Sequence, residues 1–341
     1  MLAHPRIVPV FFGEDGDRPQ IEAFVAALST SAYWTQTTAE YGVGPLTVDS
    51  SIVSNEAPPA MITAQDIEAW LGAQPFVSAD RVYALFYPSQ TTIVDRAGDL
   101  GCVTFGGFHG EARTASGESV VYLAMPRCAS IGDLRGIDAL TALLSHELVE
   151  ASTDPLPRTS PAYAAVDADH MVWNVLPLGE VGDLCSYEPR SYDRLVDSFV
   201  VQRMWSNAAA RAGHDPCVPA PASPYFKAVP VLDEAVTLDY DGLSVPTLGA
   251  RVPLGESRTI DVQLTSDAPT SDWNVRAIDA ASLANDPPEL TFSWDAQRGN
   301  DGDTLHLTIT RLADGPYRGS EIIVSTDQGT TSHLWFGFVG N

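Results

Sequence analysis

The stretch that decides the fold is Ile137–Pro155, which reads I-D-A-L-T-A-L-L-S-H-E-L-V-E-A-S-T-D-P. Its apolar residues recur at helical spacing and cover most of the circumference, a pattern typical of a buried helix. These residues are Ile137, Leu140, Leu144 and Leu148 on one face, with Ala139, Ala142, Leu143 and Val149 around them. Pro155 cannot continue a helix, so we expect the helix to end just before it.

This apolar helix carries three titratable side chains in its last turns, His146, Glu147 and Glu150. Residues four apart share a helix face, so His146 and Glu150 point the same way, with Glu147 about 100° further round. Buried charge is costly unless it is paired or bound to metal. The spacing H-E-x-x-E is close to H-E-x-x-H, in which two ligands hold zinc and the Glu is the general base. Because Glu replaces the second His, two interpretations stay open. His146 and Glu150 either bind a metal or form an internal ion-pair cluster.

A catalytic zinc needs a third protein ligand besides the two from the helix. Asp183 is our first choice, because Gly182 frees the backbone before it and Cys185 could hold the turn covalently. The competing interpretation of Asp183 is a surface turn aspartate that bonds a local amide. Asp154, one turn past Glu150, is the alternative ligand, although an Asp before Pro often bonds local backbone instead.

Other polar residues could complete the site. His109 and His170 are further candidates for metal ligation or for stabilising a transition state, against the structural role that a lone histidine commonly has. Tyr163 or His170 could stabilise an oxyanion. His214, in G-H-D-P-C, is expected to be a loop histidine.

The charge balance narrows the classes of partner. The 341 residues hold 44 acids and 19 bases, a formal net charge of −25, and Lys227 is the single lysine. So acidic a chain disfavours nucleic acid and anionic membranes as partners and favours cations, including a metal. No stretch is long and apolar enough to span a bilayer, so we expect no membrane insertion.

The four cysteines contain no C-x-x-C pair, which argues against a thiolate zinc site or a redox dithiol. We predict two sequential disulfides, Cys102–Cys128 and Cys185–Cys217, in an oxidising compartment. Four buried free thiols in a cytosolic protein are the alternative. We therefore expect a secreted or cell-surface protein whose signal peptide is not present in this chain.

Ahead of the helix, apolar runs alternate with helical patterns. The expected strands are 6–13, 47–53, 81–87 and 119–126, and the expected helices span 20–40 and the residues following Thr63. This alternation predicts an α/β layer. The glycine-rich segment 102–113 is expected to be a loop with a short edge strand that could pair with an extended substrate. We therefore predict a zincin-like α+β catalytic domain with a mixed sheet, spanning 1–217.

Beyond residue 155 the pattern becomes irregular, before a strand over 198–205 and a short helix from Asn207. The proline-rich run at 218–224 marks a linker, taken as 218–226. Residues 227–341 contain short runs rich in β-branched and aromatic residues, which predict an all-β immunoglobulin-like sandwich. The runs are 235–239, 258–265, 273–278, 290–294, 304–310, 321–326 and 332–339. Trp273 and Trp335 are expected to pack in or against its core, and no catalytic cluster is expected there.

Three blocks together resemble a known family. They are S-H-E-L-V-E-A-S-T-D-P at 145–155, G-E-V-G-D-L-C at 179–185, and V-Q-R-M-W-S-N at 201–207 with a closing cysteine. They look like the secreted EXORDIUM / phosphate-induced protein family of plants and its bacterial relatives, and G-G-F-H-G around His109 is similar to a further block of it. The resemblance covers about residues 80–217 and leaves out the sandwich. It implies secretion or cell-surface placement, a zincin-like core and functional roles for His146, Glu147, Glu150 and Asp183, but no particular reaction.

Two functions follow from these patterns. The first is a secreted, monomeric zinc-dependent metallohydrolase, most readily a metallopeptidase acting on peptide or protein. Its zinc would be held by His146, Glu150 and Asp183, with Glu147 as general base for a metal-activated water. The second is a non-enzymatic extracellular binding protein with a structural zinc or calcium ion, whose sandwich contacts a cell-surface glycan or protein. A third interpretation is a cytosolic α/β enzyme that uses an acid/base pair without a metal. It holds only if the cysteines are free.

Overall fold

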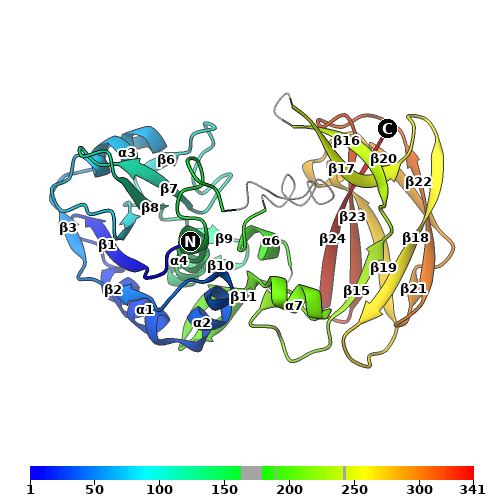
Figure 1. Cartoon of the computed structure of the whole chain (residues 1–341), viewed down its shortest axis with the longest axis horizontal. Coiled ribbons are helices and arrows are strands. Elements are labelled where there is room, and N and C mark those ends of the chain that lie inside the picture. The colour runs from blue at the N-terminus through cyan, green and yellow to red at the C-terminus, as the bar shows by residue number, and fades with distance from the viewer. Residues whose placement is uncertain (163–178, 189, 241–242) are drawn as a thin grey trace. The chain divides into compact units, whose positions relative to one another are not determined.

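The computed structural model describes residues 1–162, 179–188, 190–240 and 243–341. The chain divides into two compact units (Figure 1). The first unit comprises Met1–Ala164, Tyr192–Ser206 and Cys217–Pro219, and the second comprises Ala165–Ser191, Asn207–Pro216 and Ala220–Asn341. The chain therefore passes between the units several times. The predicted domain ranges 1–217, 218–226 and 227–341 stay a prediction.

The first unit is built on a mixed six-stranded sheet of order β2-β1-β5-β8-β7, with β3 also pairing with β1. Its strands are β1 (Arg6–Phe12), β2 (Thr47–Val48), β3 (Ile52–Ser54), β5 (Val82–Phe86), β7 (Phe108–Arg113) and β8 (Ser119–Met125). All pairs are parallel except β7 with β8, so the sheet ends in one antiparallel edge strand. The first unit therefore has the predicted mixed sheet (Figure 1), and its zincin-like character stays a prediction.

The helices of this unit cover both faces of the sheet. They are α1 (Arg18–Thr30), α2 (Ala32–Thr38), η1 (Ala39–Tyr41), α3 (Ala64–Gly72) and α4 (Gly136–Thr153). Ile67 and Leu71 of α3 share a core with Tyr83, Leu85 and Tyr122 of the central strands. Helix α4 packs with α1 and α2 and against β7 and β8. Side chains alternate along a strand, so every second residue of the central strands faces α3. The residues in between face the opposite side of the sheet, where α4 packs.

The short strands complete this unit, and three expectations are corrected. The short strands are β4 (Met61–Thr63), β6 (Thr92–Val94), β9 (Ser130–Ile131), β10 (Leu134–Arg135), β11 (Tyr192–Val196), β12 (Phe199–Gln202), β13 (Met204–Trp205) and β14 (Cys217–Val218). The strand expected over 47–53 is two strands, β2 and β3, with residues 49–51 between them. The single helix expected over 20–40 is wrong: the chain breaks at Ser31, whose hydroxyl caps α2 by accepting from the Trp34 amide at 3.2 Å. The strand expected over 198–205 is likewise two strands, β12 and β13, with Arg203 between them.

The second unit contains a β-sandwich. One sheet has the order β15-β18-β22-β20 and the other β16-β17-β24-β23-β19-β21. The strands are β15 (Phe226–Pro230), β16 (Glu234–Tyr240), β17 (Leu243–Arg251), β18 (Ser257–Ser266), β19 (Trp273–Asp279), β20 (Leu290–Trp294), β21 (Arg298–Gly299), β22 (Thr304–Arg311), β23 (Ser320–Gln328) and β24 (Thr331–Gly340). The unit also holds α6 (Asp183–Ser186), α7 (Asn207–Ala212) and η3 (Ala280–Ala284).

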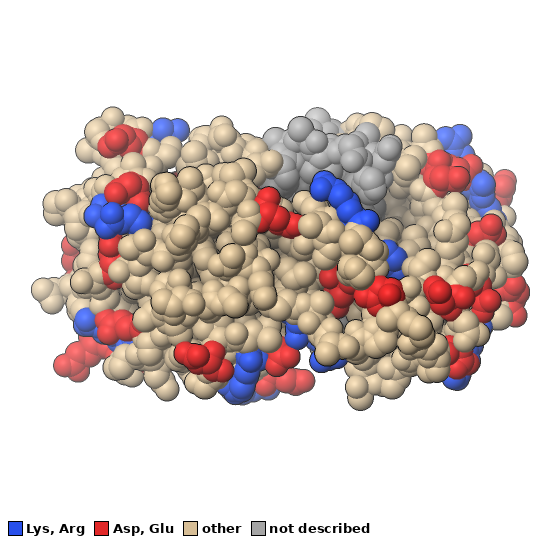
Figure 2. Space-filling model, turned by 60° about the horizontal axis from the view of Figure 1, so that its bottom comes forward, with Lys and Arg blue, Asp and Glu red and all other residues tan. Residues whose placement is uncertain are grey.

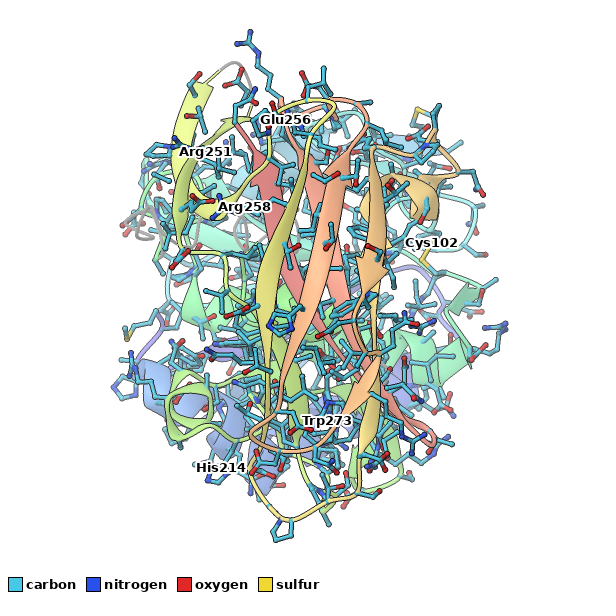
Figure 3. All side chains as sticks on the ribbon, turned by 90° about the vertical axis from the view of Figure 1, so that its right-hand side faces the viewer. Cys102, His214, Arg251, Glu256, Arg258 and Trp273 are labelled. Atoms are coloured by element: carbon cyan, nitrogen blue, oxygen red, sulfur yellow. A yellow bond between two sulfur atoms is a disulfide. The ribbon has the colours of Figure 1, made fainter. Side chains whose placement is uncertain are left out.

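The strand order of the sandwich is that of the immunoglobulin fold. Seven strands remain when the hairpin β16–β17 and the two-residue strand β21 are set aside. Numbered in sequence, the first, second, fifth and fourth (β15, β18, β22, β20) form one sheet, and the third, sixth and seventh (β19, β23, β24) lie side by side in the other, as in that fold. Both sheets contribute to one core, in which Trp273 is buried and Trp335 partly buried, as expected. Figure 3 shows Trp273 at the end of the sandwich opposite Glu256 and Arg258. The sequence pattern missed β15 and β17, because Pro230, Pro246 and Gly249 interrupt their apolar alternation.

The cysteines lie within the described residues, and none of them is free. Cys102 and Cys128 form one disulfide, and Cys185 and Cys217 are also disulfide-bonded. The predicted sequential pairing is thus confirmed, and it indicates an oxidising environment.

The surface of the chain carries the acidic excess of the sequence. Asp and Glu side chains are spread over the displayed face and do not gather in one patch (Figure 2). Among the described residues, no helix combines the length and hydropathy that a membrane span requires.

Candidate metal centre

The candidate site is built on α4, which begins at Gly136 and ends at Thr153, close to the predicted limits. Most of the helix is buried, as its apolar circumference predicts. The burial includes the two glutamates of the H-E-x-x-E pattern, because Glu147 is only 4% exposed and Glu150 only 3%. These carboxylates therefore need partners inside the protein.

Strand β12 runs beside α4 and is held there by two hydroxyl groups of the helix. Thr141 Oγ1 donates to the Val200 carbonyl at 2.8 Å, and Ser145 Oγ accepts from the Gln202 amide at 3.0 Å. Thr141 and Ser145 are four residues apart and so share one helix face. The alignment places Gln202 next to His146, where its side-chain Oε1 lies 3.0 Å from His146 Nδ1.

His109 reaches the same helix from edge strand β7. It pairs in register with Leu123 of β8, so it lies on the sheet face that packs against α4. The two glycines just before it allow this close approach. A Cβ at Gly106 would clash with Leu143, and a Cβ at Gly107 would lie 3.2 Å from both Cγ and Oε1 of Glu147.

The four side chains form one buried cluster. His146 Nε2 lies 3.0 Å from Glu150 Oε2, while His109 Nδ1 lies 3.7 Å from Glu147 Oε2 and 4.0 Å from Glu150 Oε2. Only 5% of the His109 side chain and 12% of the His146 side chain are exposed. Glu150 accordingly has a potential ligand oxygen within 4.8 Å of a ring nitrogen of each histidine.

The outer contacts of the histidines orient their rings toward the carboxylates. His109 Nε2 lies 3.0 Å from the carbonyl oxygen of Asp154, which can only accept, so Nε2 carries the proton. His146 Nδ1 donates to Gln202 Oε1 in the same way. If the imidazoles are neutral, the other nitrogen of each ring points a lone pair at carboxylate oxygens. The oxygens carry lone pairs too, so this contact is repulsive. A cation between the groups, or a second proton on each ring, makes the contact favourable.

Edge strand β7 also fixes the chain that leaves α4. Glu111 is buried, and its carboxylate accepts from the Thr159 amide at 2.8 Å and the Thr159 hydroxyl at 2.7 Å. Arg158 Nη2 donates to the Glu111 carbonyl at 2.7 Å. These contacts keep the end of α4, and with it the Asp154 carbonyl that orients His109, against the strand.

The side chain of Asp154 bonds the local backbone, which was the alternative to metal ligation. Its Oδ1 accepts from the Ala162 amide at 2.9 Å, and burial raises the pKa of its carboxyl. Its backbone carbonyl contributes to the site by bonding His109. Asp154 therefore supports the cluster through its main chain.

Asp183 is the first residue of α6, a four-residue helix preceded by Gly182, where the sequence suggested an open turn. It belongs to the second unit, and its ligation of a metal stays a prediction. Cys185, two residues on, is fully buried and disulfide-bonded, so the expected covalent restraint near Asp183 is confirmed.

Two further predicted residues, Tyr163 and His170, lie outside the described residues. His214 is a loop histidine as expected, lying beyond α7 with Nδ1 3.1 Å from Asp267 Oδ2. It lies at the same end of the sandwich as Trp273 (Figure 3).

The sequence interpretation missed Gln202 and the glycine pair 106–107. Gln202 stands in the V-Q-R-M-W block, and the glycines precede His109 in G-G-F-H-G. The sequence predicts an edge strand in one segment and a strand in the other, but nothing local shows that either segment meets α4.

Comparison with known proteins gives no family for this chain. No protein-family model matches it, and no curated protein matches its sequence. Among solved structures, it is similar to a chimeric titin Z1Z2 functionalised with a KLER peptide from decorin, at 13% identity and a TM-score of 0.20, over 35% of this chain and 94% of that one. It is similar to the titin M3 domain at 12% identity and the same TM-score, over 34% of this chain and 94% of that one. The strand order of the sandwich, and not this likeness, identifies its fold.

Proposed function

We propose that this protein is a secreted zinc-dependent metallohydrolase, most readily a metallopeptidase, whose centre is the α4 cluster. One observation carries the proposal: two imidazoles, each with one ring nitrogen bonded to a carbonyl oxygen, turn the other toward two buried glutamates. A histidine that ligates a metal usually donates its second N–H to a carbonyl or carboxylate in this manner. His146, Glu150 and Asp183 are the proposed ligands, and Glu147 is the proposed general base.

The chemistry of the donors fits zinc. Imidazole nitrogen and carboxylate oxygen are both common zinc ligands. A dication with two neutral histidines and the carboxylates Glu147, Glu150 and Asp183 leaves a net charge of −1 where the carboxylates alone would carry −3, which suits a site with so little exposure. Two protonated histidines with the same carboxylates also leave −1, so the choice between the two arrangements depends on metal binding.

The residues of the chain have distinct tasks in this proposal. Zinc would polarise the scissile carbonyl and lower the pKa of a bound water to about 7. Glu147 would take the proton of the attacking water and pass it to the leaving amine. His109 Nδ1, at 3.7 Å from Glu147 Oε2, would orient that carboxylate and donate to the developing oxyanion once protonated. The outer edge of β7 would hold an extended peptide by main-chain hydrogen bonds.

Two carboxylate ligands donate more charge to zinc than two histidines do. The metal should therefore be a weaker Lewis acid than in an H-E-x-x-H site, and we expect modest turnover or a narrow substrate range. The resemblance of the 145–155 and 179–185 segments to a secreted family supports the placement outside the cell, as the disulfides do.

The decisive test is Glu147→Gln in the full chain. Zinc content, measured by elemental analysis, should stay at the wild-type ratio, while cleavage of a quenched fluorescent peptide library should fall by at least about 100-fold, in the range of lost general-base catalysis. Glu14→Gln, at an exposed position, is the matched control and should keep wild-type turnover. Undiminished cleavage by Glu147→Gln would refute the assigned base.

A structural cation in a binding protein is the second candidate, favoured by the immunoglobulin strand order of the second unit. Elemental analysis of protein purified without added metal separates the two. Calcium or no metal, together with absent cleavage by wild type, would favour the binding protein. Zinc with cleavage that depends on Glu147 would favour the hydrolase.

A further inference from the structure

The peptide bond between Asp154 and Pro155, directly after α4, is one of three Asp–Pro bonds in the chain. Both of its residues are buried, whereas the Asp–Pro bond at residues 286–287 is exposed. In any such bond the aspartate carboxyl can attack the main-chain carbonyl of its own residue and close a five-membered ring, because both groups belong to one residue. How fast this happens depends on the groups around the bond.

The main-chain carbonyl of Asp154 accepts a hydrogen bond from His109 of strand β7. His109 Nε2 lies 3.0 Å from this oxygen and carries the proton, because a carbonyl oxygen can only accept. A donor at this position stabilises the negative charge that develops on the oxygen when the carbonyl carbon is attacked. The His109 side chain is only 5% exposed, so water weakens the interaction little.

The side chain of Asp154 supplies the attacking group. Its Oδ1 accepts from the Ala162 amide at 2.9 Å, and its Oδ2 is buried with no hydrogen-bond partner among the described residues. A buried polar atom without a partner calls for an explanation, and a part in a reaction is one. Burial also raises the pKa of this carboxyl, which favours the acid form.

The chain is held on both sides of the bond. Before it, the Asp154 amide donates to the Glu150 carbonyl at 2.7 Å. After it, the Thr159 amide donates to the Glu111 carboxylate of β7 at 2.8 Å. His109 lies on the same strand, so β7 positions both the donor and the chain that carries the bond. Reactions within one molecule gain most when the groups are fixed in this way.

We propose that Asp154 and His109 cleave the chain at the bond between Asp154 and Pro155. A carboxyl oxygen of Asp154 bonds to the carbonyl carbon of its own residue, while the His109 Nε2–H group stabilises the negative carbonyl oxygen. The bond from this carbon to the proline nitrogen then breaks, and the carboxyl proton passes to that nitrogen. The products are a cyclic anhydride at Asp154 and a free amino terminus at Pro155. One water then hydrolyses the anhydride to two carboxyl groups, so the net reaction is hydrolysis of one peptide bond.

This reaction is independent of the metal site proposed above, and its products are easily recognised. Cleavage separates residues 1–154 from residues 155–341. The Cys102–Cys128 disulfide lies within the first fragment, and the disulfide-bonded Cys185 and Cys217 lie within the second. The fragments therefore separate in a denaturing gel without reductant.

The test incubates the full chain with a metal chelator at one mildly acidic pH, both folded and in denaturant, and quantifies the fragments by mass spectrometry. In the folded chain, the bond at 154–155 should break roughly 100-fold faster than the exposed bond at 286–287, which is the gain that one donor to a developing oxyanion provides. In denaturant, the two bonds should break at similar rates, because the contacts around Asp154 are lost. Equal rates in the folded chain, or a cut at 154–155 only when the chelator is omitted, would overturn the proposal.

Variants test the two assigned roles. Asp154→Asn keeps an oxygen acceptor for the Ala162 amide but removes the attacking carboxyl, and it should abolish the cut. His109→Leu removes the donor and should slow the cut by roughly 100-fold, whereas His109→Gln can still donate to the Asp154 carbonyl and should retain part of the rate. Asp286→Asn, at the exposed Asp–Pro bond, is the matched control and should be cut at 154–155 as wild type is. A wild-type rate of cleavage in folded His109→Leu, or in folded Asp154→Asn, would refute the proposal.

Discussion

Buried carboxylates occur in both units, and the two units accommodate them differently. In the first, Glu147 and Glu150 of α4 face the imidazoles of His109 and His146. In the second, Glu321 of β23 is partly buried beside another acid, Glu289, and one of its oxygens has no hydrogen-bond partner.

The electrostatic consequences differ accordingly. Desolvation by burial, followed by repulsion from Glu289, raises the pKa of Glu321 from 4.5 to about 7. The sandwich thus tolerates its carboxyl by favouring the neutral acid, whereas the α4 cluster surrounds its carboxylates with nitrogen donors. A buried acid that can simply take up a proton needs no cation. In the α4 cluster two oriented imidazoles face the two carboxylates, and imidazole nitrogen with carboxylate oxygen is a donor set that zinc accepts.

Of the changes considered, metal removal should have the largest effect on stability. It tests most directly whether the acids of the two units differ. A chelator should lower the free energy of unfolding of the first unit by about 4 kcal/mol relative to protein with free zinc at a thousand times its dissociation constant, since zinc binds only the folded site. The second unit supplies one of the three proposed ligands, Asp183, so its unfolding transition should shift less than that of the first unit. Calorimetry with and without chelator measures both transitions. An unchanged first unit in zinc-loaded protein would mean that the α4 cluster is an ion-pair network.

Glu321→Gln should give the next largest effect, in the opposite direction. A folded-state pKa raised to about 7 means that Glu321 favours the folded sandwich most below pH 4.5. This contribution is lost as the pH rises to 7 and stays absent above it. The loss is at most roughly 3 kcal/mol, and solvent screening of this partly exposed side chain reduces it to about 1–2 kcal/mol. The glutamine variant should therefore be more stable than wild type by about 1–2 kcal/mol at pH 8.

Denaturant unfolding of wild type and Glu321→Gln at pH 4 and pH 8 checks this prediction. The two proteins should converge at pH 4, where the wild-type side chain is protonated in both states. Glu256→Gln is the control, and its difference from wild type should not change with pH. A stability difference of Glu321→Gln that is equal at both pH values would show that the charge of Glu321 is not its cause.

The smallest effect is expected from Gly107→Ala. A Cβ there would lie 3.2 Å from Glu147 Cγ and Oε1, so the carboxylate must move by a few tenths of an ångström. We expect a loss of stability of about 1 kcal/mol or less and a few-fold loss of turnover from the displaced base. Gly117→Ala is the control. Gly117 lies in the turn between β7 and β8, where an added Cβ would not contact Glu147, so this variant separates a general loss of stability from displacement of the base. Its own positive φ of 87° makes it costly to fold but should leave turnover per folded molecule unchanged.

Local sequence signals predicted the elements that depend on neighbours along the chain. The capping box of α3 is present, with the Thr63 hydroxyl accepting from the Asp66 amide and the Asp66 carboxylate accepting from the Thr63 amide. Helix α4 and its buried acids also follow from periodicity, and the sandwich from the spacing of β-branched runs. Strand β17 escaped prediction because Pro246 and Gly249 disrupt its pattern, and only pairing with β16 and β24 makes it a strand.

The sequence by itself determined that an apolar helix carrying His146, Glu147 and Glu150 would be buried, because helical pitch and apolar periodicity are local properties. Only the tertiary structure decided that His109 would face the same carboxylates and that Gln202 would orient His146. Those contacts join residues 38 to 56 positions apart, for His109 with Glu147 and for His146 with Gln202. They depend on β7 closing the sheet edge and on the Thr141 and Ser145 hydroxyls aligning β12, and no periodicity within one segment specifies such long-range geometry.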